Sequence, residues 1–250
     1  MMRFNGKTVL VTGGSSGIGF AAAKRVTDEG GRVIITGRNQ TNLDAAVKKL
    51  GKMAQFIVSD ASSMRDIDAL FSFIKKDVGL IDGLFANAGT VIFEPVEEVT
   101  EEHFDRLMNM NVKSVFFTLQ KAIPHLADGA SIVVNASVAG STGRPTSSVY
   151  SATKAAVRSM ARTFAASLVA RKIRVNAVSP GPIDTPLWFV EGGLPANQVN
   201  KVLEDIKASN PMKRFGSAEE VAAAVAFLLA SESSYITGSE LFVDGGVTQL

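Results

Sequence analysis

Cysteine is absent from the 250-residue chain. The protein therefore has no disulfide framework, no thiolate nucleophile and no cysteine-ligated metal site. The absence is typical of proteins in a reducing compartment, and we expect a cytoplasmic protein.

Long apolar runs are also missing. The longest extends over ten residues, from Val221 to Ala230, whereas a membrane-spanning helix needs about 20. No signal peptide is recognisable in the first residues, which lead directly into a short apolar strand. We therefore expect no association with a membrane.

Charge and histidine are limited as well. The formal net charge is +2 and the basic residues are scattered, so no basic stripe favours binding to nucleic acid. The two histidines, His103 and His125, are isolated in the sequence. Without a cluster of histidine and carboxylate ligands, we expect both to be helix-surface residues and predict no catalytic metal.

What the chain does contain is a regular alternation of β-branched runs and helical patterns. The predicted strands are 8–12, 32–36, 55–58, 84–86, 131–134, 174–178 and 240–243. The predicted helices are 18–29, 41–50, 63–78, 101–127, 148–171 and 218–231. Continuous apolar strands between helices are typical of a parallel sheet covered on both faces. We predict one doubly wound α/β domain over residues 1–250, a Rossmann fold of about seven strands.

The segment 182–216 lacks this alternation and contains four prolines and a Gly192-Gly193 pair. Long irregular segments in compact domains often act as lids. We predict a substrate lid at about 182–216; a plain surface excursion is the alternative.

A glycine-rich turn, Gly13-Gly14-Ser15-Ser16-Gly17-Ile18-Gly19, follows the first predicted strand. Glycines allow a sharp turn and close approach of a pyrophosphate, and the helix that follows offers free N–H groups. The position between the first strand and the first helix indicates a dinucleotide site, although a turn without a ligand can share the pattern.

Tyr150 and Lys154 lie four residues apart on a predicted helix and so share one face. An ammonium group beside a phenol lowers the phenol's pKa, so Tyr150 could exchange a proton with a carbonyl or alcohol oxygen. Ser137, 13 residues before Tyr150, follows a predicted strand and has a hydroxyl suited to an oxyanion. A half-exposed tyrosine beside a solvated lysine is the alternative.

Asn111 lies in an otherwise apolar helical stretch. An amide is unfavourable there by helix propensity, which suggests a specific role, with a satisfied core amide as the alternative.

Seven short motifs, in order along nearly the whole chain, resemble the short-chain dehydrogenase/reductase family. Besides the glycine turn, Asn111, Ser137 and the Tyr-x-x-x-Lys pair, they are Ala86-Asn87-Ala88-Gly89, Pro180-Gly181 and Val243-Asp244-Gly245-Gly246. Ala86 stands where the family has a first asparagine, but the functional Asn87 is kept.

The resemblance implies roles for particular residues. Asn111, Ser137, Tyr150 and Lys154 would be catalytic, with Ser137 and Tyr150 on the substrate oxygen and Asn111 holding a relay water. Lys154 would also bind the nicotinamide ribose. The cofactor contacts would be Gly13, Ser15, Ser16, Gly17, Ile18, Gly19, Arg38, Asn39, Asp60, Ala61, Asn87, Ala88, Gly89, Tyr150, Lys154, Pro180, Gly181, Ile183 and Thr185.

The position expected to hold an acidic residue in NAD-preferring sites is Gly37, at the end of the second strand. Arg38 follows and could bind a 2′-phosphate with two hydrogen bonds, supported by Asn39 and Ser15. A solvated surface arginine is the alternative. We predict NADP(H) as the cofactor.

We expect reversible carbonyl reduction, of a ketone, an aldehyde or a 3-oxoacyl group. Apolar lid residues, among them Leu187 and Trp188, suggest a small-molecule substrate with an apolar or aromatic body. By resemblance we also expect a homotetramer or homodimer, and the C-terminal Gln249 is similar to tails that bind magnesium in some relatives. A non-catalytic NADP(H)-binding regulatory or sensor protein is one rival. An epimerase or dehydratase is another, although such relatives are usually longer.

Overall fold

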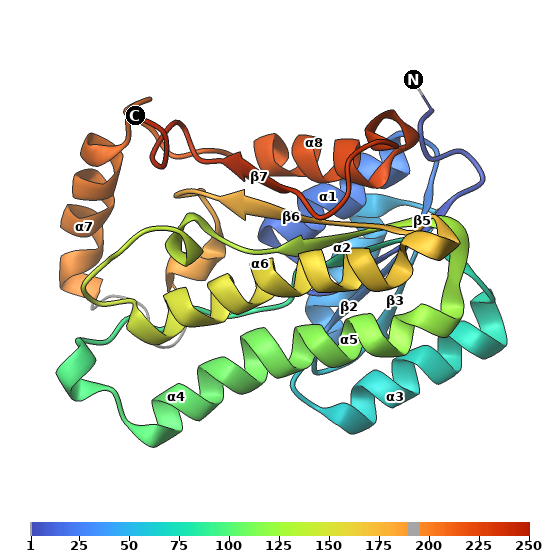
Figure 1. Cartoon of the computed structure of the whole chain (residues 1–250), viewed down its shortest axis with the longest axis horizontal. Coiled ribbons are helices and arrows are strands. Elements are labelled where there is room, and N and C mark those ends of the chain that lie inside the picture. The colour runs from blue at the N-terminus through green and yellow to red at the C-terminus, as the bar shows by residue number, and fades with distance from the viewer. Residues whose placement is uncertain (1, 190–195) are drawn as a thin grey trace.

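The computed structural model describes residues 2–189 and 196–250, and no side chain within 188–200. Its centre is one parallel sheet with the strand order β3-β2-β1-β4-β5-β6-β7 (Figure 1). The strands are β1 (Thr8–Val11), β2 (Arg32–Gly37), β3 (Ala54–Val58), β4 (Ile81–Ala86), β5 (Leu126–Asn135), β6 (Arg174–Pro180) and β7 (Glu240–Val243). All seven predicted strands are confirmed, as is the doubly wound α/β fold.

Helices cover both faces of the sheet because the buried strands are apolar on both sides. One core layer lies under α3 (Met64–Phe73), α5 (Ser114–Ala122) and α6 (Ser148–Leu168). The other lies under α1 (Gly17–Asp28), α2 (Gln40–Leu50) and α8 (Ala218–Leu229). Leu10, Leu84 and Ile132, on adjacent central strands, are fully buried. The two layers hold the carboxyl ends of the strands in fixed positions.

The predicted helix 101–127 is interrupted. It consists of α4 (Glu101–Met108), a π-helical turn at Asn109–Lys113, α5 and a short 3₁₀ turn, and β5 begins at Leu126. A second π-helical turn, Ile74–Val78, ends the predicted helix 63–78. A π turn adds one residue per turn and changes which side chains face inward. Hydrophobic periodicity alone does not reveal such a change.

The sequence predicted an irregular segment over 182–216. The structure differs, because the segment contains the helix α7 (Ala196–Ser209). Figure 1 shows α7 standing beside the sheet, beyond the carboxyl end of β6. The ends of the segment meet where Asp184 N donates to Gly216 O and Gly216 N donates to Pro182 O. The segment is therefore an excursion that leaves and rejoins the domain at one point. Its predicted role as a lid stays a prediction.

Strand order reverses between β1 and β4, which are hydrogen-bonded neighbours although β2 and β3 separate them in sequence. Open parallel sheets bind ligands outside the carboxyl ends of the strands at such a switch point. The glycine-rich turn follows β1 and Asn87 follows β4, so both lie at this point.

Candidate active site

A cavity of about 570 Å³ opens at the carboxyl ends of the strands. That volume suits a small-molecule or cofactor site. Its walls bring together segments from residue 13 to residue 187. Of the predicted site residues, the lining includes Gly13, Ser15, Ser16, Gly17, Ile18, Arg38, Asp60, Ala61, Asn87, Ala88, Gly89, Ser137, Tyr150, Lys154, Pro180, Gly181, Ile183, Thr185 and Leu187.

Two glycines of the glycine-rich turn, Gly14 and Gly19, lie too close to neighbouring atoms to carry a side chain. A Cβ on Gly14 would lie 2.7 Å from the Ile35 side chain, and one on Gly19 only 2.2 Å from the carbonyl oxygen of Gly13. Gly17 has a positive φ of 53°, which disfavours any other residue. Gly19 does not line the cavity; its role is to let α1 approach the turn.

The N-terminus of α1 faces this cavity through Gly17 and Ile18. Ser16, the N-cap residue, makes no side-chain capping hydrogen bond, and the first turn contains no acidic residue. The N-terminal N–H groups and the positive end of the helix dipole therefore suit an anion such as a pyrophosphate. The geometry fits the phosphates of a dinucleotide.

Asn87 ties the glycine turn to the end of β4. Its Nδ2 donates to the carbonyl oxygens of Thr12 and Gly13, at 3.0 and 3.1 Å. The buried hydroxyl of Thr12 accepts from the backbone N–H groups of Asn87 and Ala88. These bonds fix the floor of the cavity where the two halves of the sheet meet.

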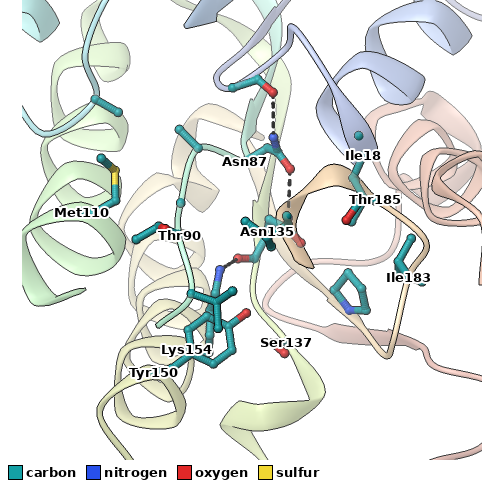
Figure 2. A pocket seen from close by; sticks show the side chains of 18 of the residues that line it. Ile18, Asn87, Thr90, Met110, Asn135, Ser137, Tyr150, Lys154, Ile183 and Thr185 are labelled. Carbon is teal, nitrogen blue, oxygen red and sulfur yellow. Dashed lines mark hydrogen bonds between the residues drawn. The ribbon is translucent and has the colours of Figure 1, made fainter. Parts of the chain in front are cut away.

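Ser137, Tyr150 and Lys154 approach one another in the cavity, as Figure 2 shows. Ser137 follows β5, and both Tyr150 and Lys154 come from the N-terminal half of α6. Lys154 Nζ lies 5.7 Å from the centre of the Tyr150 ring and donates a 2.8 Å hydrogen bond to the carbonyl oxygen of Asn135. The arrangement can hold a carbonyl oxygen between two hydroxyl groups.

Burial controls the ionisation of this pair. It raises the pKa of Tyr150 above its ordinary value, and the hydrogen bond from Ser137 opposes that rise. Burial also lowers the pKa of Lys154 to about 8. The expected lowering of the Tyr150 pKa is therefore not found in the chain alone, because desolvation of the phenolate outweighs the stabilisation by its neighbours. Tyr150 rests as the neutral phenol, the form that can donate a proton.

Asn111 lies in the π-helical turn and is buried. Its Oδ1 accepts from Thr90 N at 2.8 Å, and its Nδ2 donates to Thr90 O and to the hydroxyl of Thr153. Asn111 thus fastens the segment after β4 to α6. It does not line the cavity, and these contacts match the satisfied core amide. The water-relay role stays a prediction.

The adenosine end of the predicted site contains Arg38, Gly37 and Ser15, all lining the cavity. A Cβ on Gly37 would lie 3.4 Å from the hydroxyl oxygen of Ser15. Asp60 lines the cavity nearby and accepts from the N–H and hydroxyl of Ser62. Asn39 is exposed outside the lining and caps α2, where its Oδ1 accepts from the N–H of residue 42.

Apolar side chains line part of the cavity: Val91, Phe93, Met110, Val138 and Leu187. The polar Asn109 and the basic Arg106 and Arg144 line it as well. Of the two lid residues predicted to meet substrate, Leu187 lines the cavity and is 39% exposed. The side chain of Trp188, and the lid residues Val190 and Leu194, lie outside what the structure describes.

Both histidines are less exposed than predicted. The His103 side chain is only 10% exposed, 4.0 Å from Glu94, and the His125 ring stacks on Phe71 at 5.8 Å. Burial lowers the pKa of His125. Among the described residues, no group of three or more histidine, cysteine or carboxylate side chains is arranged to hold a metal ion. Within the same residues, no helix combines the length and apolarity needed to cross a membrane.

Sequence reasoning missed several polar residues of the site. The Thr12 hydroxyl accepts from backbone N–H groups, the backbone of Thr90 is bonded by the Asn111 side chain, and Asn135 lies between Asn87 and Lys154. Asn135 did carry a signal, because it is an amide at the end of the apolar run Ile132–Val134. Arg106 and Arg144 also line the cavity.

Known proteins are similar to this chain over nearly its full length. A family model described as enoyl-(acyl carrier protein) reductase matches residues 13–248. Oxidoreductase asL5 from Sarocladium schorii is 40% identical over 252 residues, which cover 100% of this chain and 99% of the relative. Glucose 1-dehydrogenase from Gluconobacter oxydans is 39% identical, with coverage of 98% and 93%. The crystal structure of levodione reductase superposes with a TM-score of 0.92 at 33% identity, covering 98% of both chains.

Proposed function

This chain belongs to the short-chain dehydrogenase/reductase family, and on that premise we propose that it interconverts a carbonyl group and an alcohol with NADP(H). The family consists of oxidoreductases that bind a nicotinamide cofactor, NAD or NADP. The observation that carries the proposal is the meeting of Ser137, Tyr150 and Lys154 in the cavity that the glycine turn also lines.

Each of the three residues would have its own role in the reaction. Ser137 donates a hydrogen bond to the substrate oxygen and keeps it beside Tyr150. Tyr150 gives its proton to that oxygen during reduction and takes it back during oxidation. Lys154, held by the Asn135 carbonyl, places a positive charge beside the phenolate that forms. The nicotinamide, when bound, supplies or accepts the hydride.

The choice of NADP(H) rests on the end of β2. Gly37 has no carboxylate to repel a 2′-phosphate, and Arg38 brings a guanidinium to the same part of the cavity. Ser15 adds a neutral donor beside Gly37. Asn39 caps α2 through its Oδ1 and lies outside the cavity lining, and its Nδ2 stays the proposed donor.

For the substrate we propose a ketone, aldehyde or 3-oxoacyl compound with an apolar body. Apolar side chains in the cavity lining support this, among them Val91, Phe93, Met110 and Leu187. The relative named glucose 1-dehydrogenase raises the opposite possibility, a polyhydroxylated sugar. A panel of cyclic and aromatic ketones, aldehydes, a 3-oxoacyl thioester and aldoses distinguishes them: turnover of aldoses alone contradicts the apolar assignment.

The first prediction concerns Tyr150. Tyr150→Phe keeps the ring and removes the proton donor, so kcat should fall by about 10²- to 10⁴-fold, while the dissociation constant for NADPH stays within about twofold. Steady-state rates and fluorescence titration measure the two quantities. Tyr235→Phe is the matched control, because Tyr235, the other tyrosine, is 103% exposed. Near wild-type turnover by Tyr150→Phe would show that another group transfers the proton.

The second prediction concerns cofactor choice. The wild type should prefer NADPH in kcat/KM, and loss of a charge-assisted hydrogen bond of roughly 1.5–3 kcal/mol corresponds to about 10- to 100-fold. Gly37→Asp with Arg38→Ile should reverse much of that preference. Arg32→Ile, at the exposed start of the same strand, should leave it unchanged. A wild-type enzyme that uses NADH equally well or better contradicts the assignment.

The rival reading is a cofactor-binding regulatory protein without turnover. It predicts that NADPH binds but that no member of the carbonyl panel oxidises it. The convergence of a proton donor and a lysine at the cavity favours an enzyme, because a binder needs neither.

A further inference from the structure

The side-chain amide of Asn135 has a fixed orientation. Asn87 Nδ2 donates to two backbone carbonyls of the glycine turn, so Asn87 Oδ1 must face the other way. There it accepts from Asn135 Nδ2 at 2.9 Å. Reversing Asn135 would place two carbonyl oxygens against each other. The bond pattern therefore turns Asn135 Oδ1 away from Asn87.

That oxygen lacks a donor within the part of the chain that the structure describes. Among the residues that the structure describes, Asn135 Oδ1 is the one buried side-chain nitrogen or oxygen without a hydrogen-bond partner. Buried acceptors in native proteins are nearly always paired, so an exception calls for a specific reason. Asn135 also lines the cavity.

The position of Asn135 indicates what the donor is. Its side chain is bonded to Asn87, which holds the glycine turn, and its own carbonyl oxygen accepts from Lys154. Figure 2 shows Asn135 between these two residues, with Thr185 and Ile183 across the cavity. Asn135 thus lies between the phosphate-binding turn and the proton-transfer group. A dinucleotide that reached from the glycine turn to Tyr150 would place its nicotinamide nucleoside half beside Asn135.

We propose that Asn135 is a cofactor-positioning residue whose Oδ1 accepts a hydrogen bond from the nicotinamide nucleoside half of the bound dinucleotide. Two kinds of donor exist on that half, the ribose hydroxyls and the carboxamide N–H groups. The inference rests on the proposed function, since it requires a nicotinamide cofactor in this cavity. Through this bond Asn135 would link the glycine turn, by its side chain, and Lys154, by its backbone carbonyl, to the nicotinamide nucleoside.

The test compares ligands that contain or lack the nicotinamide nucleoside. The dissociation constants of NADPH, 2′-phospho-ADP-ribose and adenosine 2′,5′-bisphosphate are measured by calorimetry for the wild type, Asn135→Leu and Asn135→Ala. Both variants should bind NADPH about tenfold more weakly, the loss expected for one hydrogen bond, and should bind the bisphosphate as the wild type does. Retained bisphosphate binding also shows that the variants are folded.

The intermediate ligand identifies the donor. Weakened binding of 2′-phospho-ADP-ribose, which keeps the ribose but lacks the ring, assigns the ribose hydroxyl; unchanged binding assigns the carboxamide, and either outcome supports the proposal. Asn42→Leu makes the same substitution at an exposed residue outside the cavity lining and should not alter NADPH binding.

Two outcomes overturn the proposal. Unchanged NADPH affinity in the Asn135 variants means that Oδ1 meets no cofactor donor. Equal weakening of NADPH and the bisphosphate means that Asn135 only supports Asn87 and the glycine turn. If the wild type binds NADH instead, the same series is run with NADH, ADP-ribose and AMP. A wild type that binds neither dinucleotide refutes the proposed function and this inference with it.

Discussion

Lys154 affects both the stability of the folded protein and the chemistry proposed for the site. Its ammonium is buried and hydrogen-bonded to a backbone carbonyl oxygen rather than to a carboxylate. Burial therefore lowers its pKa from 10.5 to about 8. The folded protein is destabilised by holding this charge at neutral pH, which is the cost of placing a cation beside Tyr150.

A pH-dependent gain in stability follows from that shift. Between pH 8 and 10.5 the unfolded chain binds more protons at Lys154 than the folded chain, so this group makes unfolding less favourable as pH rises. The wild type should gain about 2 kcal/mol relative to Lys154→Met between pH 7 and pH 9.5. Urea unfolding of both proteins at the two pH values measures the difference and cancels the other titrating groups. An unchanged difference would mean that Lys154 titrates near its ordinary pKa.

At the scale of the element, the sequence predicted the strands, which follow from the hydrophobic pattern, and the turn that glycines make possible. Strands such as Thr8–Val11 are continuous apolar runs, and the glycine turn after β1 is recognisable from its spacing. The capping box of Ser217 and Glu220, which begins α8, is a local pattern of the same kind.

The remaining features depend on tertiary contacts. The π turn at Asn109–Lys113 depends on bonds between Asn111 and the distant Thr90 and Thr153, which no local pattern encodes. α7 was hidden because prolines and glycines flank it. The link from Asn87 to Asn135 joins residues 48 apart in sequence, so it was visible only after folding.

Arg174 joins two elements and carries the next prediction. It is 8% exposed at the start of β6 and donates to the carbonyls of Leu228 and Ala230 and to the hydroxyl of Ser233, around the C-terminus of α8. Burial lowers its pKa, and the negative end of the helix dipole offsets part of that cost.

Arg174→Met should lower the free energy of unfolding by about 3 kcal/mol, because several buried acceptors lose their donor. Arg174→Lys should recover only part of the loss, since an ammonium group cannot reproduce the planar fork of a guanidinium. Thermal and urea unfolding check both variants. A lysine variant as stable as the wild type would show that charge alone, and not the fork, stabilises this end of α8.

At the scale of the whole molecule, two of the surfaces with exposed apolar side chains bear on assembly. Phe104 on α4 and Phe116 on α5 are 46% and 38% exposed, and β7 is an edge strand with Leu241 36% exposed. Unpaired strand edges and apolar patches favour association. We propose that these two surfaces form the subunit interfaces.

The last prediction is therefore a homotetramer. Light scattering after size-exclusion chromatography should give a mass near four times 26.4 kDa. Phe116→Glu or Leu241→Glu should each reduce the assembly to dimers by placing a charge in one interface, with circular dichroism unchanged. A wild-type protein that elutes at the mass of one chain at micromolar concentration contradicts the prediction.

The two ends of the sheet differ in how well they should tolerate inserted sequence. The predicted site lies in the loops that follow the carboxyl ends of the strands. At the opposite ends, Gly51 and Gly79 precede β3 and β4, and a Cβ on either would meet no atom within 4 Å. Exposed turns of this kind tolerate inserted sequence. A peptide tag or fused domain therefore belongs at these amino-terminal turns, where added sequence leaves the cavity intact, whereas additions after β1, β4 or β5 would enter it.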